Sequence, residues 1–599
     1  MNVQTMTAER PLLWPDHALS GLDKLVTGLL LAAVAVMVGV VSAQVALRYG
    51  FNRSIDWADE IGRLAFVWSI FLAIPLGVRQ GAHIGIDVVA DKLPAVWRGV
   101  LKRAGAALCA LMMVAIAWAA LGVARTVGRT DGHRRLERRL VHRAGGHRRA
   151  AVRLAPAAHR HRRAAGHTAG SGRMSALVVV GFMALALLGL PIAFSMGVAS
   201  LVALWLSGVD LSMVPQRMMH SVNSFPLMSI PFFMLAGELM IKAGIVERLI
   251  ALANTLVGRV RGGMAHVTML AGAGLATVSG AAVSDASALS SILAPSLTKI
   301  YDKGFAAAIV AAAANLGPII PPSGAMIVYA FMAGSSVSVG GMFMAGVVPG
   351  LIITFGFIGL CSWIATRRGW AVTGEPFRLA TVLAELRRSL IVLAMPVLVI
   401  GGIVGGAFTA TEGSAIAVVY SMLLGFFVTR TLKLADLPGL VVRAAITSAV
   451  VGALIAFASI ITYLMTVDLL PQTLSTLLRG LTTDPLVYMA LVALLLFVVG
   501  MFLESNAAYI MLVPLLHPIA LQYGIDPLHF GFLFVLNLVI GMLTPPVGVV
   551  LFVVSGVTGV RMRELVANAW PFIALMYAVL VLCMLVPSIV TALPHALGY

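Results

Sequence analysis

Two related stretches decide the fold of this chain: Asn315-Leu316-Gly317-Pro318-Ile319-Ile320-Pro321-Pro322-Ser323 and Gly541-Met542-Leu543-Thr544-Pro545-Pro546-Val547-Gly548. When their Pro-Pro pairs are aligned, position 321 falls on 545. This offset of 224 residues also places Gly317 on Gly541. About 40 residues before each pair, a short polar interruption breaks an apolar run: Ser279-Gly280-Ala281-Ala282 and Glu504-Ser505-Asn506. Paired interruptions in two hydrophobic halves are typical of a secondary transporter with internal repeats.

The four interruptions are also where we expect the transport site. A broken helix in lipid leaves backbone N–H and C=O groups unpaired, so it is tolerated only where it lines a cavity or meets a ligand. A Pro-Pro pair can instead be a plain kink. Two related kinks at one offset favour the transporter interpretation.

The composition is that of a polytopic membrane protein. Of 599 residues, 60% are hydrophobic and 11% are charged, and the mean hydropathy is +0.99. Many apolar runs are long enough to cross a hydrocarbon core about 30 Å thick. We expect spans near 24–47, 60–78, 98–123, 175–205, 225–241, 343–365, 388–407, 413–430, 440–466, 484–503 and 568–592. The predicted fold class is all-α, with re-entrant hairpins and broken helices in two repeats (about 225–365 and 440–593) and a small helical scaffold domain.

The net charge of +18 does not indicate a nucleic-acid partner, because residues 125–173 account for most of it. This segment holds fourteen Arg, no Lys, one Asp and one Glu. The three cysteines, Cys109, Cys361 and Cys583, lie in apolar runs, and no metal-ligand spacing appears. We therefore expect no disulfide framework and no cofactor, with the lipid bilayer as the surrounding medium.

The segment 126–173 is anomalous for a membrane protein. Arg, His, Ala and Gly without Lys is the composition that an out-of-frame reading of GC-rich coding DNA produces. The loop after the second span carries Arg79, Lys92, Arg98, Lys102 and Arg103, so it should be cytoplasmic. The third span would then put fourteen Arg on the outer face. We predict that 127–173 replaces a fourth transmembrane helix through a frameshift; the alternative is a genuine basic linker.

The first 125 residues carry a recognisable pattern. Arg48-Tyr49-Gly50-Phe51-Asn52 is followed by Trp57, Asp59-Glu60 and Arg63, and later by His83-Ile84-Gly85-Ile86-Asp87. This pattern resembles the small membrane subunit of tripartite ATP-independent periplasmic (TRAP) transporters. Residues 1–125 would then form the small permease domain, with three legible transmembrane helices. Because Glu60 and Arg63 share a helix face, we expect them to have a structural role.

Residues 174–599 resemble the large TRAP permease subunit. The matching stretches include Ile230-Pro231-Phe232-Phe233-Met234, Ser279-Gly280-Ala281-Ala282-Val283-Ser284-Asp285 and Phe408-Thr409-Ala410-Thr411-Glu412-Gly413. Met174 looks like the original start of a separate subunit. The family more often has Ser, Pro and Asp where this chain has Ala281, Ala410 and Glu504.

A coupling ion would serve an anionic cargo. Moving one unit charge through 100 mV changes the free energy by about 2.3 kcal/mol, and co-transported Na⁺ neutralises a carboxylate. Na⁺ should seek oxygen ligands, as other hard cations do. Unwound backbone and helix N-termini at the breaks supply sites for cation and anion. We predict one Na⁺ per repeat, bound by Ser279, Gly280, Asn315, Gly317 and Ser323 in the first and by Ser505, Asn506, Gly541 and Thr544 in the second.

The candidates for substrate contact or gating begin with three acids among apolar runs, because such residues are unfavourable in lipid. They are Asp285, Glu412 and Glu504, together with Thr409, Pro321, Pro322, Pro545 and Pro546. Each has a structural alternative. Ser and Gly permit close helix packing, Asp285 could brace a hairpin, and Glu412 could be a charge at a helix N-terminus.

The resemblance implies Na⁺-coupled import of a small organic acid, such as a dicarboxylate, keto acid or sugar acid. It also implies an elevator-type mechanism in the bacterial inner membrane, with a periplasmic solute-binding protein that delivers the substrate. One alternative is an H⁺- or Na⁺-coupled carboxylate carrier that needs no binding protein. Another is an inactive frameshifted product. We expect no enzyme, because nucleophile-elbow and metalloprotease motifs are missing from the sequence.

Overall fold

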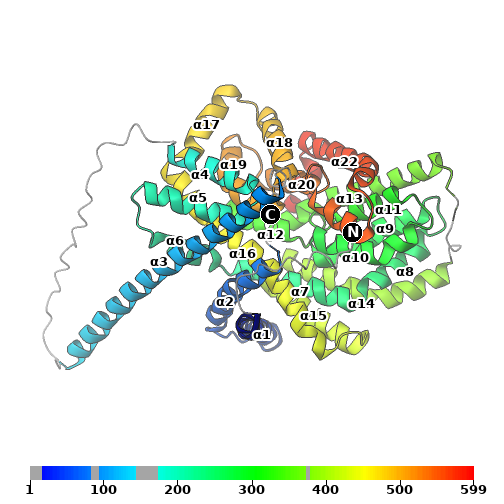
Figure 1. Ribbon diagram of the computed structural model, residues 1–599. Coiled ribbons are helices and arrows are strands. Elements are labelled where there is room, and N and C mark those ends of the chain that lie inside the picture. The colour runs from blue at the N-terminus through cyan, green and yellow to red at the C-terminus, as the bar shows by residue number, and fades with distance from the viewer. Residues whose placement is uncertain (1–15, 83–93, 144–172, 371, 373–377) are drawn as a thin grey trace. The chain divides into compact units, whose positions relative to one another are not determined.

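The computed structural model describes residues 16–82, 94–143, 173–370, 372 and 378–599 (Figure 1). Within these ranges all regular secondary structure is helical. Nine helical segments of the described chain are long and apolar enough to cross a membrane. The predicted fold class, an all-α polytopic membrane protein, is therefore confirmed.

The chain divides into two compact units, which are described separately. The first comprises Met1–Ile84, Val222–Ile455 and Leu474–Tyr599, and the second comprises Gly85–Ser221 and Ala456–Thr473. These units follow packing rather than chain order. The domain boundaries at 125 and 174 that we expect from the sequence stay a prediction.

The helices repeat with the offset found in the sequence. The earlier set is α8 (Ile245–Val257), α9 (Gly263–Ser279), α10 (Ala282–Leu297), α11 (Lys303–Ala314), α12 (Gly324–Ala333) and α13 (Val339–Arg367). A shift of 224 residues brings these onto α17 (Leu470–Leu481), α18 (Pro485–Phe502), α19 (Ser505–Gln522), α20 (Pro527–Gly541), α21 (Val549–Thr558) and α22 (Met562–Leu585). The two Pro-Pro pairs thus mark two copies of one helical pattern.

The two repeats interlock. Helix α10 packs against α21, and its counterpart α19 packs against α12. Between them, Nδ2 of Asn315 donates a hydrogen bond to the carbonyl oxygen of Val539 at 3.0 Å. These two residues are 224 positions apart, so they are equivalent positions of the two repeats. Equivalent positions touch only near a symmetry axis, so this bond lies close to the approximate two-fold axis.

Other helices of the first unit surround the repeats. Helix α1 (Asp16–Phe51) packs against α2 (Ala58–Arg79), and Arg79 forms an ion pair with Asp23 between them. Helix α15 (Ala410–Leu423) packs against α1, α7 (Ser229–Lys242) and α14 (Leu379–Val404). The unit also contains α23 (Ser588–Ala596) and most of α16 (Leu437–Val467).

The second unit holds α3 (Ala95–Arg143), α4 (Arg173–Leu187), α5 (Ile192–Leu206), most of α6 (Met213–Val222) and the end of α16. The backbone N–H and Oγ of Ser175 both donate to Oδ2 of Asp468, at 2.7 and 2.9 Å. One expectation was wrong: residues 175–205 form α4 and α5 rather than one span. The chain breaks at Gly189, whose φ is 90°, and at Pro191, which is the N-cap of the next helix.

The anomalous segment is described only in part. Helix α3 continues through Arg143, and residues 144–172 lie outside the described residues. The proposed frameshift at 127–173 therefore stays a prediction.

Candidate functional site

The first hairpin tip lies against the first broken helix. Gly280 joins α9 to α10 with a φ of 61°, and a Cβ added there would lie 2.5 Å from the carbonyl oxygen of Pro322. A Cβ added to Gly317 would lie 2.7 Å from Oδ2 of Asp285. Because both positions lack a side chain, the tip and the break approach each other at backbone distance.

Polar groups of this first meeting point are only partly paired. The Ser279 hydroxyl donates to Oδ1 of Asp285, and the Ser323 hydroxyl donates to the carbonyl oxygen of Pro318 at 2.7 Å. Oδ2 of Asp285 and Oδ1 of Asn315 are buried and have no hydrogen-bond partner among the described residues. Two buried oxygen atoms therefore remain available here.

The second tip and the second break meet in the same way. A Cβ added to Gly541 would lie 2.6 Å from the carbonyl carbon of Gly500, near the end of α18. The backbone N–H of Val547 donates to the carbonyl oxygen of Met501 at 3.3 Å. Thr544 is buried, and its hydroxyl donates to the carbonyl oxygen four residues earlier at 2.9 Å.

The second tip has its own acid and its own unpaired oxygen. Glu504 caps α19, because its carboxylate accepts from the Ala507 backbone N–H at 3.2 Å and from Nδ2 of Asn506 at 2.7 Å. The Ser505 hydroxyl is buried and has no partner in the described part of the chain. Each repeat therefore offers an acid and at least one unpaired oxygen.

One cavity of about 250 Å³ touches both tips. Its lining includes Gly280, Ala281 and Ala282 of the first tip, Pro318 and Gly324 of the first break, Glu504, Ser505 and Asn506 of the second tip, and Met542 of the second break. Thr447, Val450 and Val451 of α16 also line it. This volume is just below the range of roughly 300–1,000 Å³ that is usual for small-molecule sites.

Three helices begin at this cavity. Ala282 is the first residue of α10, Gly324 of α12 and Ser505 of α19, and all three line it. Helix N-termini carry partial positive charge and unpaired N–H groups, which favour anions. The cavity thus combines positive helix ends with unpaired oxygen atoms.

A second, more polar cavity of about 520 Å³ adjoins the first, since both are lined by Ala82, Met234, Ala281, Val283 and Thr447. Its lining further includes Ser279, three serines of α10, and an ion pair between Glu238 and Arg443. The two hollows together reach from the hairpin tips to the end of α2.

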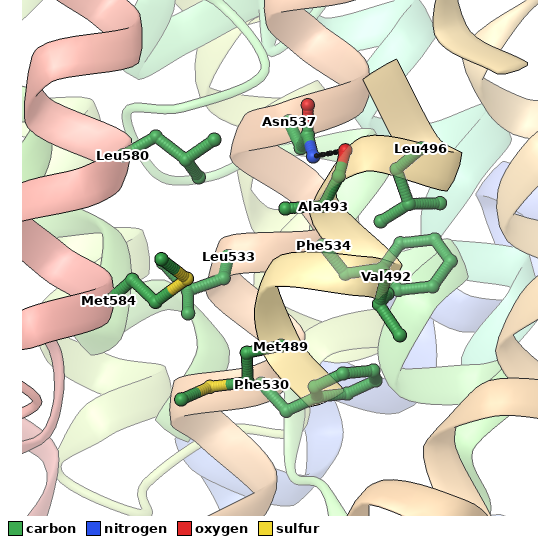
Figure 2. Close-up of a pocket in the computed structure, with 10 residues that line it drawn as sticks. All are labelled: Met489, Val492, Ala493, Leu496, Phe530, Leu533, Phe534, Asn537, Leu580 and Met584. Atoms are coloured by element: carbon green, nitrogen blue, oxygen red, sulfur yellow. Dashed lines mark hydrogen bonds between the residues drawn. The ribbon is translucent and has the colours of Figure 1, made fainter. Parts of the chain in front are cut away.

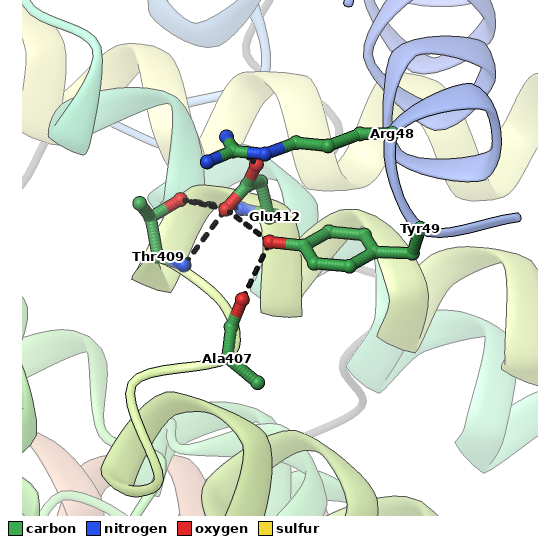
Figure 3. Close-up of polar contacts among 5 residues, drawn as sticks. All are labelled: Arg48, Tyr49, Ala407, Thr409 and Glu412. Carbon is green, nitrogen blue, oxygen red and sulfur yellow. Dashed lines mark hydrogen bonds and ion pairs between the residues drawn. The ribbon is translucent and has the colours of Figure 1, made fainter. Parts of the chain in front are cut away.

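The structure places two of the predicted gating residues elsewhere (Figure 3). Thr409 and Glu412 form a capping box at the start of α15. Arg48 of α1 donates to Glu412 at 2.8 Å, and the hydroxyl of Tyr49 donates to the carbonyl oxygen of Ala407 at 2.5 Å. Glu412 is 6% exposed and Arg48 is 54% exposed. These residues join α1 to α15, and neither Thr409 nor Glu412 lines either cavity.

Several other predicted residues lie in the breaks without lining the cavities. They are Asn315, Gly317, Ser323, Pro321, Pro322, Gly541, Thr544, Pro545 and Pro546. The two Pro-Pro peptide bonds are both cis. Of these residues, Gly317, Pro322 and Ser323 lie against the first tip, and Gly541 lies against Gly500, shortly before the second tip.

A third hollow lies between α18, α20 and α22 (Figure 2). It measures about 20 Å³ and is lined by apolar side chains and by Asn537, whose Nδ2 donates to the carbonyl oxygen of Ala493 at 2.7 Å. This space suits one water molecule rather than an organic acid.

The sequence did not single out the α7 and α16 sides of the cavities. A Cβ added to Gly237 in α7 would lie 3.1 Å from the Cα of Ser279. Arg443 and Thr447 lie in α16, which has no break in its apolar pattern over these positions. The charged residues Glu238 and Arg443 were the available signals.

Two interlocked helical repeats, with hairpin tips and broken helices around a shared cavity, define a secondary transporter. Comparison with protein families agrees. Residues 179–589 match the model of the tripartite ATP-independent periplasmic transporter DctM component, and residues 37–137 match that of the DctQ component. The chain belongs to the TRAP transporter permease family, with matches to both membrane components.

Similar proteins carry different cargoes. The isethionate TRAP transporter permease protein DctMQ of Oleidesulfovibrio alaskensis is 34% identical over 94% of this chain and 93% of its own length. The C4-dicarboxylate TRAP transporter large permease protein DctM of Rhodobacter capsulatus is 35% identical over 71% of this chain and 100% of its own. The sialic acid TRAP transporter permease protein SiaT of Haemophilus influenzae is 28% identical over 93% and 96%.

Among solved structures, the Alcanivorax borkumensis YdaH transporter aligns with a TM-score of 0.42 and 16% identity, over 60% of this chain and 86% of that one.

Family membership settles the broad role. The protein is a transporter permease, not an enzyme, and a multi-pass protein of the bacterial inner membrane. TRAP permeases work with a periplasmic binding protein.

Proposed function

We propose that this permease imports a small organic acid together with Na⁺. The observation that carries the proposal is the presence of three buried, unpaired side-chain oxygens: those of Asp285 and Ser505 at the two hairpin tips and that of Asn315 in the first break. Buried polar atoms normally have a partner, so each of these oxygens calls for one. A hard cation with oxygen ligands is a suitable partner.

Na⁺ explains these oxygens better than H⁺ does. The Asn315 amide oxygen and the Ser505 hydroxyl do not titrate in the physiological range, so a proton cannot be their partner. The Asp285 carboxylate could accept a proton, which keeps H⁺ coupling as the alternative. We infer one Na⁺ per repeat, held in the first by Asp285 and Asn315 and in the second by Ser505, with backbone carbonyls of the breaks.

The substrate we propose is an organic anion. The N-termini of α10, α12 and α19 meet the cavity, and a carboxylate or sulfonate there would face free N–H groups. Isethionate, C4-dicarboxylates and sialic acid, which the relatives' names specify, share this negative charge. We propose the class of substrate, organic anions with a carboxylate or sulfonate group, and no particular acid.

We further propose that the structure represents an inward-facing state. Arg259, Arg261, Lys299 and Lys303 flank the base of the first hairpin. The base of the second has Arg479, which donates to the carbonyl oxygen of Gln522 at 2.9 Å, and residues 480–560 contain no further Lys or Arg. By the positive-inside rule, the first hairpin enters from the cytoplasm and the second from the periplasm. The larger cavity follows α10 from the first tip toward its base, hence toward the cytoplasm. Import would then move the repeats against the surrounding helices, as an elevator does.

Reconstituted uptake tests the proposal. The protein is placed in liposomes, and accumulation of labelled isethionate, succinate and sialic acid is measured with an inward Na⁺ gradient, with K⁺ in its place, and with an inward H⁺ gradient. Each condition is run with and without the binding protein encoded nearest to the gene. Na⁺-dependent uptake that requires the binding protein is expected. Uptake driven by H⁺ alone, or unaffected by the binding protein, would favour the alternative carrier.

A further inference from the structure

A single cationic side chain lines the route between the hairpin tips and the larger cavity. Of the described residues around the two adjoining hollows, Arg443 of α16 alone is positively charged. Glu238 of α7 lies opposite it, and the hydrogen bond between them joins Nε to Oε2 at 3.1 Å. An anion that leaves the tips through the larger cavity must pass this guanidinium.

The Glu238–Arg443 ion pair is suited to replacement of Glu238 by another anion rather than to permanent bracing of α7 against α16. The side chains are 27% and 58% exposed, so water screens their attraction and the pair is weak. The contact with Glu238 uses only Nε of the guanidinium. The planar fork of terminal N–H groups matches a carboxylate or sulfonate in a bidentate arrangement, which a lysine ammonium does not offer.

The wall beside Arg443 is polar on one helix face. Ser284, Ser287 and Ser291 of α10 are spaced by three and four residues, so they share one face, and all three line the larger cavity. The hydroxyl of Ser291 donates to the carbonyl oxygen of Ser287 at 2.8 Å, and its lone pairs remain free to meet water. This face gives a polar path from the first tip past the ion pair.

We propose that Arg443 is an anion-binding residue for the departing substrate, with Glu238 as its exchangeable internal partner. The acid group of the substrate displaces Glu238 from Arg443 on its way to the cytoplasm, and Glu238 returns when the substrate leaves. The inference rests on the proposed import of an organic acid. It adds a specificity residue outside the hairpin tips and the breaks.

The local field of Arg443 is measurable without any substrate. In a variant whose three native cysteines are replaced by alanine, Ser287→Cys reports on the cavity. Its reaction rates with an anionic (sulfonatoethyl) and a cationic (trimethylammonioethyl) methanethiosulfonate are compared. Arg443→Gln should lower the anionic-to-cationic rate ratio about fivefold, and Glu238→Gln should raise it by a similar factor. A cysteine at the exposed position Ser588 should show neither change.

Transport kinetics then separate anion binding from bracing. Arg443→Gln should raise the KM for the acid, with partial rescue by Arg443→Lys, whereas Glu238→Gln should lower the KM and slow turnover. A merely structural ion pair predicts the same loss for both variants. Arg388→Gln, which removes an exposed arginine paired with Glu385 at 2.8 Å, is the matched control and should match wild type.

The outcomes distinguish the two proposals. A wild-type protein without Na⁺-driven uptake overturns the proposed function, while the thiol rate ratios still test Arg443. Normal wild-type uptake, with rate ratios unmoved and both variants impaired alike, overturns the role of Arg443 and leaves the proposed function intact.

Discussion

At the residue scale, an acid and an amide define the first of the two ion sites that we propose. Asp285 uses one carboxylate oxygen to accept from Ser279, and Asn315 uses its amide nitrogen to bridge the repeats. Oδ2 of Asp285 and Oδ1 of Asn315 remain buried and unpaired. Such an arrangement is unfavourable without a partner, because a buried polar group that makes no hydrogen bond loses its hydration without compensation. A bound cation would remove this penalty.

Asp285→Asn should therefore weaken Na⁺ binding while it preserves the shape of the side chain. We expect the Na⁺ concentration for half-maximal uptake to rise about tenfold or more, because the ligand charge is lost. The matched control is Ser290→Ala on the same helix, since the Ser290 hydroxyl is also buried without a partner. An unchanged Na⁺ dependence in Asp285→Asn would exclude the carboxylate from the site.

Gly280 is a position where backbone geometry and close contact act together. Gly280→Ala meets a positive φ and a carbonyl oxygen 2.5 Å from the new Cβ, so we expect lost transport and about 1–3 kcal/mol lower stability. Gly524 also has a positive φ, 73°, but nothing lies within 4 Å of its Cβ position. Gly524→Ala should show only the strain of about 1 kcal/mol and retain transport. Thermal unfolding and uptake are measured for both, and equal behaviour would contradict a contact role for the tip.

At the element scale, the sequence predicted the breaks but not the walls around them. Proline, glycine and small polar residues at one offset reveal where a membrane helix stops, because few other residues can stop it. An uninterrupted apolar helix such as α16 gives no comparable signal for the face that lines a cavity. The break at Gly189–Pro191 between α4 and α5 was missed for a similar reason, because residues 175–205 read as one long apolar run.

Glu412 illustrates how one sequence feature suits two roles. The acid among apolar residues suggested substrate contact or gating, yet in the structure it caps α15 and pairs with Arg48 of α1. Glu412→Ala should lower the free energy of unfolding by about 1–2 kcal/mol, through the lost cap and a partly screened ion pair.

The Na⁺ dependence of uptake by Glu412→Ala should stay that of wild type, in contrast to Asp285→Asn. The control Glu385→Ala removes an exposed pair within one helix and should change stability by less than about 0.5 kcal/mol. A tenfold shift in Na⁺ dependence for Glu412→Ala would return this residue to the ion pathway.

At the scale of the whole molecule, two copies of one helical pattern surround a shared cavity. Because α10 packs on α21 and α12 on α19, neither repeat completes the site alone. The bond from Asn315 to Val539 joins equivalent positions of the two copies, close to the approximate two-fold axis. The repeats differ in chemistry, however: the offset places Gly280 on Glu504 and Asp285 on Tyr509. We therefore expect two ion sites of unequal affinity.

The anomalous segment is a question about the chain as a whole. The DctQ match ends at 137 and the DctM match begins at 179. A fourth span between them would bring the topology back into agreement with the positive-inside rule. Resequencing the gene should reveal an insertion or deletion near codon 127, with a corrected frame that encodes about 20 apolar residues. A clean reading frame would refute the frameshift. A reporter fused after Arg173 would then have to lie on the same side of the membrane as one fused after Arg125.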